Sequence, residues 1–162
     1  MNKVKLLMLF IVAFSLVSCG DDEDYKSNPP KFADITFRAL NGSSELKAGE
    51  PFVATAEQSQ KGTWLITTDY SWETAPAEGV THKYVPSLNY GLNSSNPSDT
   101  LVVSTPGVYT LTFHAYYRTA GQRGLSETLQ ESLPDYGTVK YEVFGAAVFH
   151  YEVTATKRFM VK

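Results

Sequence analysis

Residues 108–118 alternate apolar and polar side chains with a period of two. One face holds Tyr109, Leu111, Phe113 and Ala115, and the other holds Thr110, Thr112, His114 and Tyr116. Successive side chains of a strand point to opposite faces of a sheet, so this pattern predicts a long strand with one buried face. Such a face has to be covered by a second layer of structure.

The rest of the chain contains shorter segments of strand composition, separated by turn residues such as Asn41-Gly42 and Lys61-Gly62. The predicted strands are 34–40, 51–57, 63–67, 69–73, 82–86, 100–104, 108–118, 139–144, 147–154 and 158–161. One short helix is predicted over 126–133, because Ser126 can cap it and Pro134 ends it. Many short strands separated by turns indicate an all-β sandwich.

The first 18 residues have the pattern of a secretory signal peptide. Lys3 and Lys5 are basic, and the apolar run that follows, 6–17, is interrupted only by Ser15. This run is shorter than the roughly 20 residues that a membrane-spanning helix needs. A buried N-terminal helix is the alternative, but the run gives way abruptly to acidic sequence. We therefore predict that residues 1–18 are removed.

The apolar run ends in Leu16, Val17, Ser18 and Cys19, which together resemble a bacterial lipobox, the motif cut by the lipoprotein signal peptidase. The resemblance implies cleavage before Cys19 and attachment of lipid to that residue. Cys19 is the single cysteine of the chain, and a thiolate is the nucleophile that this modification needs. Several acyl chains anchor a protein stably where one chain does not.

An acidic run, Asp21, Asp22, Glu23 and Asp24, follows almost directly. By composition it is a solvated linker, and its consecutive carboxylates lack the alternate spacing of a calcium loop. The run also resembles the export signal of surface lipoproteins of the Bacteroidota type, which implies a place on the outer face of the outer membrane. We expect residues 19–33 to be a lipidated tether and residues 34–162 to be the folded body.

Two segments of the body resemble the immunoglobulin-like PKD group: Tyr70-Ser71-Trp72 and residues 105–113. The resemblance implies that Trp72 is buried on strand C. It also implies that Tyr109, on strand F, is a tyrosine corner whose hydroxyl bonds backbone near the start of the strand. Glu73-Thr74-Ala75-Pro76 replaces the usual glycine-rich turn, and 119–146 is long for a connection between strands F and G. The expected fold is a PKD-like β-sandwich with an inserted segment or additional hairpin before the last strands.

The composition contains little that points to catalysis or to nucleic acid. The net charge is −3, with 14 basic and 17 acidic side chains, so a nucleic-acid partner has no electrostatic basis. The histidines, His82, His114 and His150, lack metal-ligand spacing. Glu127, Glu131 and Asp135 have helical spacing, which on a short helix indicates a solvated face. We expect no cofactor, no metal and no enzymatic activity.

Aromatic side chains are the remaining functional resource, because the chain has 10 Tyr, 9 Phe and 2 Trp. Tyr and Trp offer rigid area that stacks on sugars or on a protein partner. The candidate ligand-binding residues are Trp64, Tyr84, Tyr90, Tyr116, Tyr117 and Tyr136. The competing interpretation is that aromatics form the core and cross-strand pairs, as expected of Phe37, Phe52, Trp72, Tyr109 and Phe113.

Two classes of function are left open by the sequence. The first is a lipid-anchored, non-catalytic binding or adhesion module on the cell surface, with a glycan or another outer-membrane protein as its ligand. The alternative is an accessory structural subunit of an outer-membrane complex that has no ligand of its own.

Overall fold

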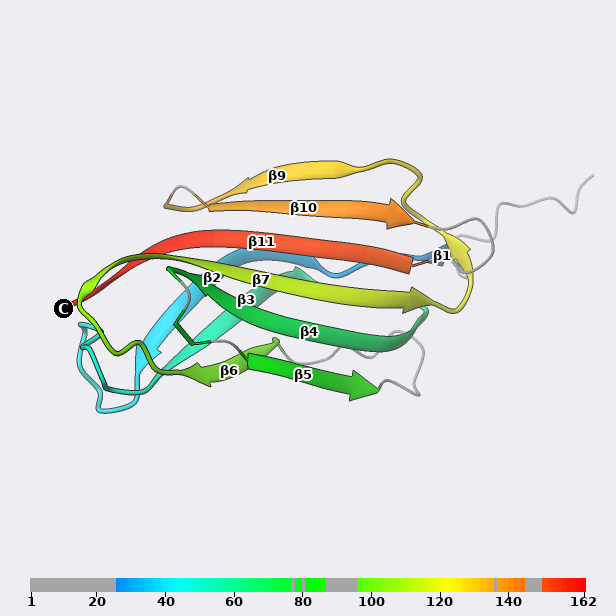
Figure 1. The fold of residues 1–162 in the computed structure, drawn as a ribbon. Helices are drawn as coiled ribbons and strands as arrows, with labels where there is room; N and C mark the ends of the chain where they lie inside the picture. The colour runs from blue at the N-terminus through cyan, green and yellow to red at the C-terminus, as the bar shows by residue number, and fades with distance from the viewer. Residues whose placement is uncertain (1–25, 77, 80, 87–95, 136, 145–149) are drawn as a thin grey trace, which may run out of the picture.

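The computed structural model describes residues 26–76, 78–79, 81–86, 96–135, 137–144 and 150–162. This part of the chain is built from strands connected by turns and loops (Figure 1). The strands are β1 (Lys26–Ser27), β2 (Lys31–Ala39), β3 (Phe52–Gln60), β4 (Leu65–Ala75), β5 (Thr81–Pro86), β6 (Ser98–Leu101), β7 (Gly107–Thr119), β8 (Gln122–Arg123), β9 (Leu129–Leu133), β10 (Gly137–Phe144) and β11 (His150–Val161).

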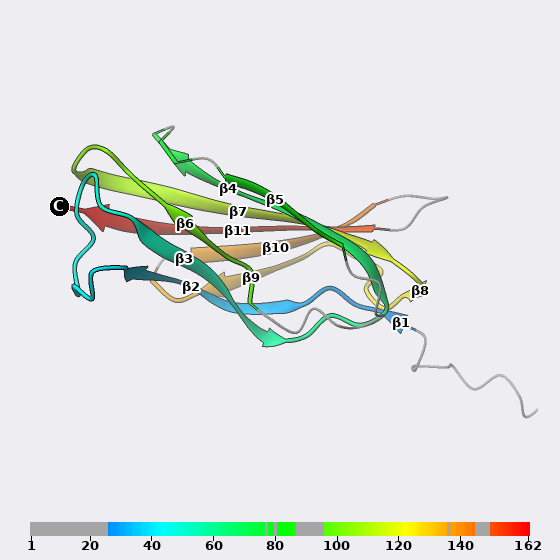
Figure 2. The ribbon, with the colours of Figure 1, turned by 90° about the horizontal axis from the view of Figure 1, so that it is seen from below.

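Two sheets lie against each other as layers, as a second view of the ribbon shows (Figure 2). One sheet has the strand order β5-β4-β7-β11-β10-β9, the other has the order β2-β3-β6, and β1 and β8 form a separate parallel pair. Side chains from both layers share one core; Phe32 of β2, for example, meets Phe113 of β7 edge-on at a centroid distance of 5.4 Å. The protein is therefore all-β with packed sheets, as expected.

β7 crosses the centre of the larger sheet and confirms the alternation seen in the sequence. Leu111, Phe113 and Ala115 are fully buried, whereas the intervening residues are partly exposed. β4 and β11 flank it as antiparallel neighbours. Because β7 has a partner on each edge and the opposite sheet on its buried face, it is the strand around which the core is built.

Two pairs of predicted strands are single strands in the structure. β4 joins 63–67 to 69–73, and β11 joins the described part of 147–154 to 158–161. Thr68 lies between the first two predicted strands and Lys157 lies in the gap 155–157 between the last two; both are polar residues that nevertheless point inward and are buried. Lys157 tolerates this position because its Nζ lies 2.6 Å from Oδ1 of Asp34 on β2.

The helix predicted over 126–133 is wrong. Residues 129–133 form the strand β9, which pairs antiparallel with β10 from Leu129 opposite Tyr141 to Leu133 opposite Gly137. Two turns of helix are marginal in water, and the backbone of this segment finds its partners in a neighbouring strand instead. The β9–β10 hairpin is the additional hairpin expected between β7 and the last strand. Among the described residues, no helix is long and apolar enough to cross a membrane.

Both predictions about individual core aromatics are confirmed. Trp72 is fully buried and packs against Phe113 at a centroid distance of 4.7 Å, with Tyr70 buried on the same face of β4. The hydroxyl of Tyr109 donates a hydrogen bond to the carbonyl of Thr105 at 2.9 Å, just before β7 begins at Gly107.

The folded body begins earlier than the expected boundary at residue 34. Ser27 is fully buried, its hydroxyl donates to the carbonyl of Trp64 at 2.7 Å, and its carbonyl accepts a hydrogen bond from the hydroxyl of Tyr151 at 2.5 Å. These bonds hold the chain against the end of the larger sheet before β2 starts. The part of the expected tether from Lys26 onward therefore belongs to the body.

Candidate functional site

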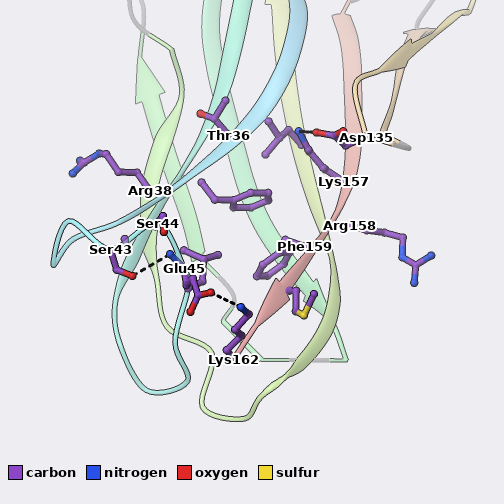
Figure 3. A pocket seen from close by; sticks show the side chains of 15 residues that line it. Thr36, Arg38, Ser43, Ser44, Glu45, Asp135, Lys157, Arg158, Phe159 and Lys162 are labelled. Carbon is purple, nitrogen blue, oxygen red and sulfur yellow. Dashed lines mark hydrogen bonds and ion pairs between the residues drawn. The ribbon is translucent and has the colours of Figure 1, made fainter.

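A cleft of about 680 Å³ opens between β2 and β11 at the end of the sandwich where the chain terminates (Figure 3). Side chains of β2 form one side and side chains of β11 form the other. The loop that follows β2 closes one end of the cleft through Ser43, Ser44 and Glu45, and the turn between β9 and β10 contributes Asp135.

The floor of the cleft is aromatic. The rings of Phe37 on β2 and Phe159 on β11 stack at a centroid distance of 4.7 Å and an interplanar angle of 23°. Phe52 and Tyr109 continue this cluster into the core, with centroids 5.6 Å and 5.7 Å from that of Phe159. An apolar floor of this kind is typical of a site that binds a ligand partly by excluding water.

Two lysines on the cleft are already paired with carboxylates. Lys157, 7% exposed, contacts Asp34 at 2.6 Å and Asp135 at 3.5 Å. Lys162 pairs with Glu45, and its hydrogen bond and positive charge hold the pKa of Glu45 below the usual value. These pairs join β2 and its following loop to β11 and therefore fix both ends of the cleft.

Unlike these lysines, two arginines on the cleft are not paired with a carboxylate of any described residue. Arg38 on β2 and Arg158 on β11 are exposed, and neither guanidinium has a hydrogen bond or an ion pair with any residue that the structure describes. The lining contains four basic and two acidic side chains. Because the acidic ones are engaged by lysines, the unmatched positive charge lies on the arginines, whose side chains extend away from each other on opposite sides of the cleft (Figure 3).

A second cluster lies on the outer face of the larger sheet and includes Tyr116. The ring of His150 stacks on Tyr116 at 4.5 Å and on Phe144 at 5.3 Å, and Glu152 lies 3.5 Å from both His150 and His114. The His150 ring is covered on both faces, which leaves little ring face for a sugar. No group of potential ligand side chains in the described ranges has the geometry to hold a metal ion.

Tyr117 is a correction to the candidate ligand-binding residues. Its side chain is fully buried between the sheets, and burial raises the pKa of its hydroxyl far above the usual value. It therefore offers no surface to a ligand. The alternation that places Tyr109 to Ala115 inward also places Tyr117 inward when it is continued by two residues, so the sequence contained the signal.

The other candidates are dispersed or lie outside the described residues. Trp64 is half-buried with a φ of 51°, and its carbonyl accepts hydrogen bonds from Ser27 and from the backbone N–H of Ala120, at the opposite end of the sheet from the cleft. Tyr84 lies in β5, of which only the backbone is described. The described part of the chain does not include Tyr90, Tyr136, the lipobox residues Leu16, Val17, Ser18 and Cys19, or the acidic residues Asp21, Asp22, Glu23 and Asp24.

The cleft residues were missed in the sequence because their importance depends on which strands are neighbours. Arg38 and Arg158 are outward residues of two predicted strands, which is an ordinary place for arginine. Nothing local indicates that β2 and β11, more than a hundred residues apart in the chain, lie on either side of one cleft. No protein-family model, curated protein or solved structure matches the chain.

Proposed function

We propose that this protein is a lipid-anchored, non-catalytic binding module on the outside of the outer membrane, and that its ligand occupies the cleft between β2 and β11. The observation that carries the proposal is an aromatic-floored cleft flanked by two guanidinium groups, Arg38 and Arg158, that lack partners among the described residues. Anchoring and surface display rest on the resemblance of Leu16-Val17-Ser18-Cys19 to a lipobox and on the acidic run that follows.

The proposal includes an immunoglobulin-like, PKD-like topology for the sandwich. The order β2-β3-β6 facing β5-β4-β7-β11 corresponds to strands A-B-E facing C′-C-F-G in such domains. The buried Trp72 on β4 and the corner hydrogen bond of Tyr109 on β7 favour the same assignment. The β9–β10 hairpin is then an insertion between strands F and G that extends the sheet beyond G.

The positions of the chain entry and of the cleft suit display from a membrane. Lys26 pairs with Gln122, which follows the C-terminal end of β7, whereas the cleft lies near the N-terminal end of β7. β7 has 13 residues, so the two ends are separated by roughly 40 Å at about 3.3 Å per residue. A lipid on Cys19 would therefore hold the cleft on the side of the molecule away from the anchor.

The charges of the cleft favour binding over catalysis. A carboxylate that acts as a general acid or base has to be free to exchange a proton with a substrate. Glu45 and Asp135 are each paired with a lysine, and the pKa of Glu45 is lowered. The alternative function, an accessory structural subunit without a ligand, predicts that the cleft is covered by a permanent neighbour or has no role.

Anchoring and binding can be tested separately in the source cells. With a clickable fatty acid, we expect the wild type to be labelled and Cys19→Ala to be unlabelled; equal labelling would contradict the anchor.

The binding test uses a panel of surfaces coated with glycans or outer-membrane proteins. We expect that cells displaying the double variant Arg38→Glu/Arg158→Glu, in the same amount as wild type, are no longer retained on at least one coating that retains the wild type. The matched control is Lys61→Glu/Arg118→Glu, which reverses the charge of two exposed basic residues outside the lining of the cleft. If no coating distinguishes the cleft variant from this control, the accessory-subunit alternative is favoured.

A further inference from the structure

Two strand edges beside the cleft have no neighbouring strand within the described ranges. β2 is the outer strand of its sheet. β11 pairs with β7 along its whole length, but its pairing with β10 ends at Thr156. Residues 157–161 therefore have one open edge, and the side chains of β2 and β11 in Figure 3 lie on opposite sides of the same cleft.

The backbone groups of Arg158 and Met160 point to this open edge of β11. In an antiparallel ladder, the N–H and C=O groups of alternate residues point to alternate edges. The carbonyl oxygen of Thr156 lies 2.9 Å from where a Cβ on Gly137 of β10 would be, so Thr156 faces the β10 edge. Two and four residues further along, Arg158 and Met160 face the same way and have no strand beside them.

Lys162 supports this assignment independently. Its N–H donates to the carbonyl of Leu46 at 2.9 Å, and its carbonyl accepts the N–H of Ala48 at 2.8 Å. Lys162 lies two residues after Met160 and four residues after Arg158, so its backbone N–H and C=O groups also point away from β7. The chain therefore already pairs Leu46 and Ala48 with this line of backbone groups, immediately beyond the open stretch.

The open stretch has the length of one short strand. The Asp135–Lys157 contact limits it at one end, and the pairing of Lys162 with Leu46 and Ala48 limits it at the other. Five residues at about 3.4 Å each span about 17 Å, which is a usual length for a strand. Open edges are normally covered or protected by charge, because each one is a template for a further strand.

We infer that the cleft binds an extended segment of a partner protein, which adds to β11 as a strand beside residues 157–161. This inference rests on the proposed function, because it names the ligand of that cleft. In such a strand, alternate side chains point toward Phe159 and the aromatic floor, and the others point outward beside Arg158. The segment therefore alternates apolar residues with acidic ones, and the acidic residues supply the partners that Arg158 lacks.

The chemistry of the cleft favours a peptide over a glycan. A sugar is recognised through an exposed ring face and polar side chains, but the Phe37 and Phe159 rings are stacked on each other at 4.7 Å. The groups without a partner among the described residues are instead the backbone N–H and C=O groups of Arg158 and Met160, together with the guanidinium groups of Arg38 and Arg158. Another strand satisfies all of these backbone groups at once.

The test uses the mature lipidated protein, purified in detergent, and a fluorescein-labelled heptapeptide of alternating glutamate and valine. We compare Met160→Pro with Met160→Thr. Both variants lose the methionine side chain, but only proline also removes the N–H that faces the open edge; the ladder to β7 keeps its hydrogen bonds in both. In fluorescence anisotropy, we expect binding to Met160→Pro to be weaker than binding to Met160→Thr by about tenfold, or about 1.4 kcal/mol.

Two further arms make the outcome decisive even if Met160→Pro unfolds. A heptapeptide with alternate backbone nitrogens methylated should not bind the wild type, and Arg158→Glu should prefer a lysine–valine heptapeptide to the glutamate–valine one. Equal binding of the methylated peptide, or no binding of any peptide, overturns the inference. A dimer of the protein that the peptide displaces would make a second copy the occupant and would also overturn it.

Failure of the inference and failure of the proposed function give different results. If the cleft variant loses retention on a glycan coating while no heptapeptide binds, the binding module stands and the strand addition is overturned. If the heptapeptide binds the purified protein but Cys19→Ala cells are labelled and display the protein like wild type, the anchor is overturned and the strand addition stands.

Discussion

Tyr109 and Tyr117 lie on the same face of β7, but their hydroxyl groups have opposite environments. The hydroxyl of Tyr109 donates to the carbonyl of Thr105, whereas the hydroxyl of Tyr117 is buried without a partner among the described residues. A buried hydroxyl without a hydrogen bond has lost its contact with water and gained nothing in exchange. The two hydroxyl groups therefore contribute with opposite sign to the free energy of unfolding.

We expect Tyr109→Phe to lower the free energy of unfolding by about 1–3 kcal/mol, because the carbonyl of Thr105 loses its donor. We expect Tyr117→Phe to raise it by about 1 kcal/mol, because the substitution removes only the unpaired hydroxyl. Urea unfolding at neutral pH measures both. A destabilised Tyr117→Phe would show that the hydroxyl is satisfied, for example by a buried water.

Trp72 is expected to be the most sensitive single position. It is fully buried against Phe113, so Trp72→Ala leaves a large cavity and should lower the free energy of unfolding by about 3–5 kcal/mol. Since small domains have only about 5–15 kcal/mol in total, the variant should unfold at a much lower urea concentration. An unchanged midpoint would contradict the assignment of β4 as the strand that anchors the core.

Alkaline pH should destabilise the protein through its buried tyrosines. Burial raises the pKa of Tyr141 to about 12, and it also raises those of Tyr117 and Tyr151. The unfolded chain loses these protons near pH 10, whereas the folded protein keeps them, so stability is complete below about pH 10 and falls as the pH rises further. In urea unfolding at several pH values, Tyr117→Phe should fall less steeply than the wild type above pH 10. Parallel curves would contradict the raised pKa of Tyr117.

At the scale of elements, stability is distributed unevenly over the larger sheet. β7 has β4 on one edge and β11 on the other, and it supplies the centre of the core. β9 has one neighbour, β10, and within it only Leu133 is fully buried. The end of β11 at 157–161 also has one strand neighbour. Edge elements of this kind open locally, whereas central strands open only when the whole domain unfolds.

We therefore expect the backbone amides of β7 to exchange with solvent deuterium at the rate of global unfolding, and those of β9 to exchange faster by local opening. Hydrogen-exchange mass spectrometry on the intact protein measures both segments in one experiment. The amide of Met160 should be among the fast ones, although it lies in a long strand. Protection of β9 equal to that of β7 would contradict its position at the edge of the sheet.

At the scale of the whole molecule, the proposed function assigns folding and anchoring to different parts of the chain. The body holds its first strand in place through the buried Ser27, which bonds Trp64 and Tyr151. The four acidic residues before it are consecutive in the sequence and repel one another, so we expect them to contribute nothing to folding. Folding and surface display should then depend on different residues.

Replacement of Asp21, Asp22, Glu23 and Asp24 with alanine should leave the melting temperature unchanged and abolish surface display. Thermal unfolding of the purified protein and protease treatment of intact cells measure the two effects. A lower melting temperature would show that the acidic run contacts the body. Unchanged accessibility to the protease would show that the run is not the export signal.

The resemblance to the PKD group implied the hydrogen bond of the Tyr109 hydroxyl. The sequence by itself determined the strand class of the body and the inward positions of Trp72 and Tyr109. These properties depend on side-chain alternation and on turn residues, which are local. The same local rules failed for 126–133, because two turns of capped helix and an edge strand have similar propensity. The strand forms because the backbone of 129–133 pairs with β10, which the local sequence does not indicate.

The tertiary structure alone decided where the cleft lies. Alternation indicates which side chains of a strand point inward, but it carries no information about which strands become neighbours. β11 extends beyond β10 because their register places Thr156 opposite Thr138, at the start of β10. That register, together with the outer position of β2, leaves Arg158 and Met160 beside an open edge, since strand pairing is set by contacts between segments far apart in the chain.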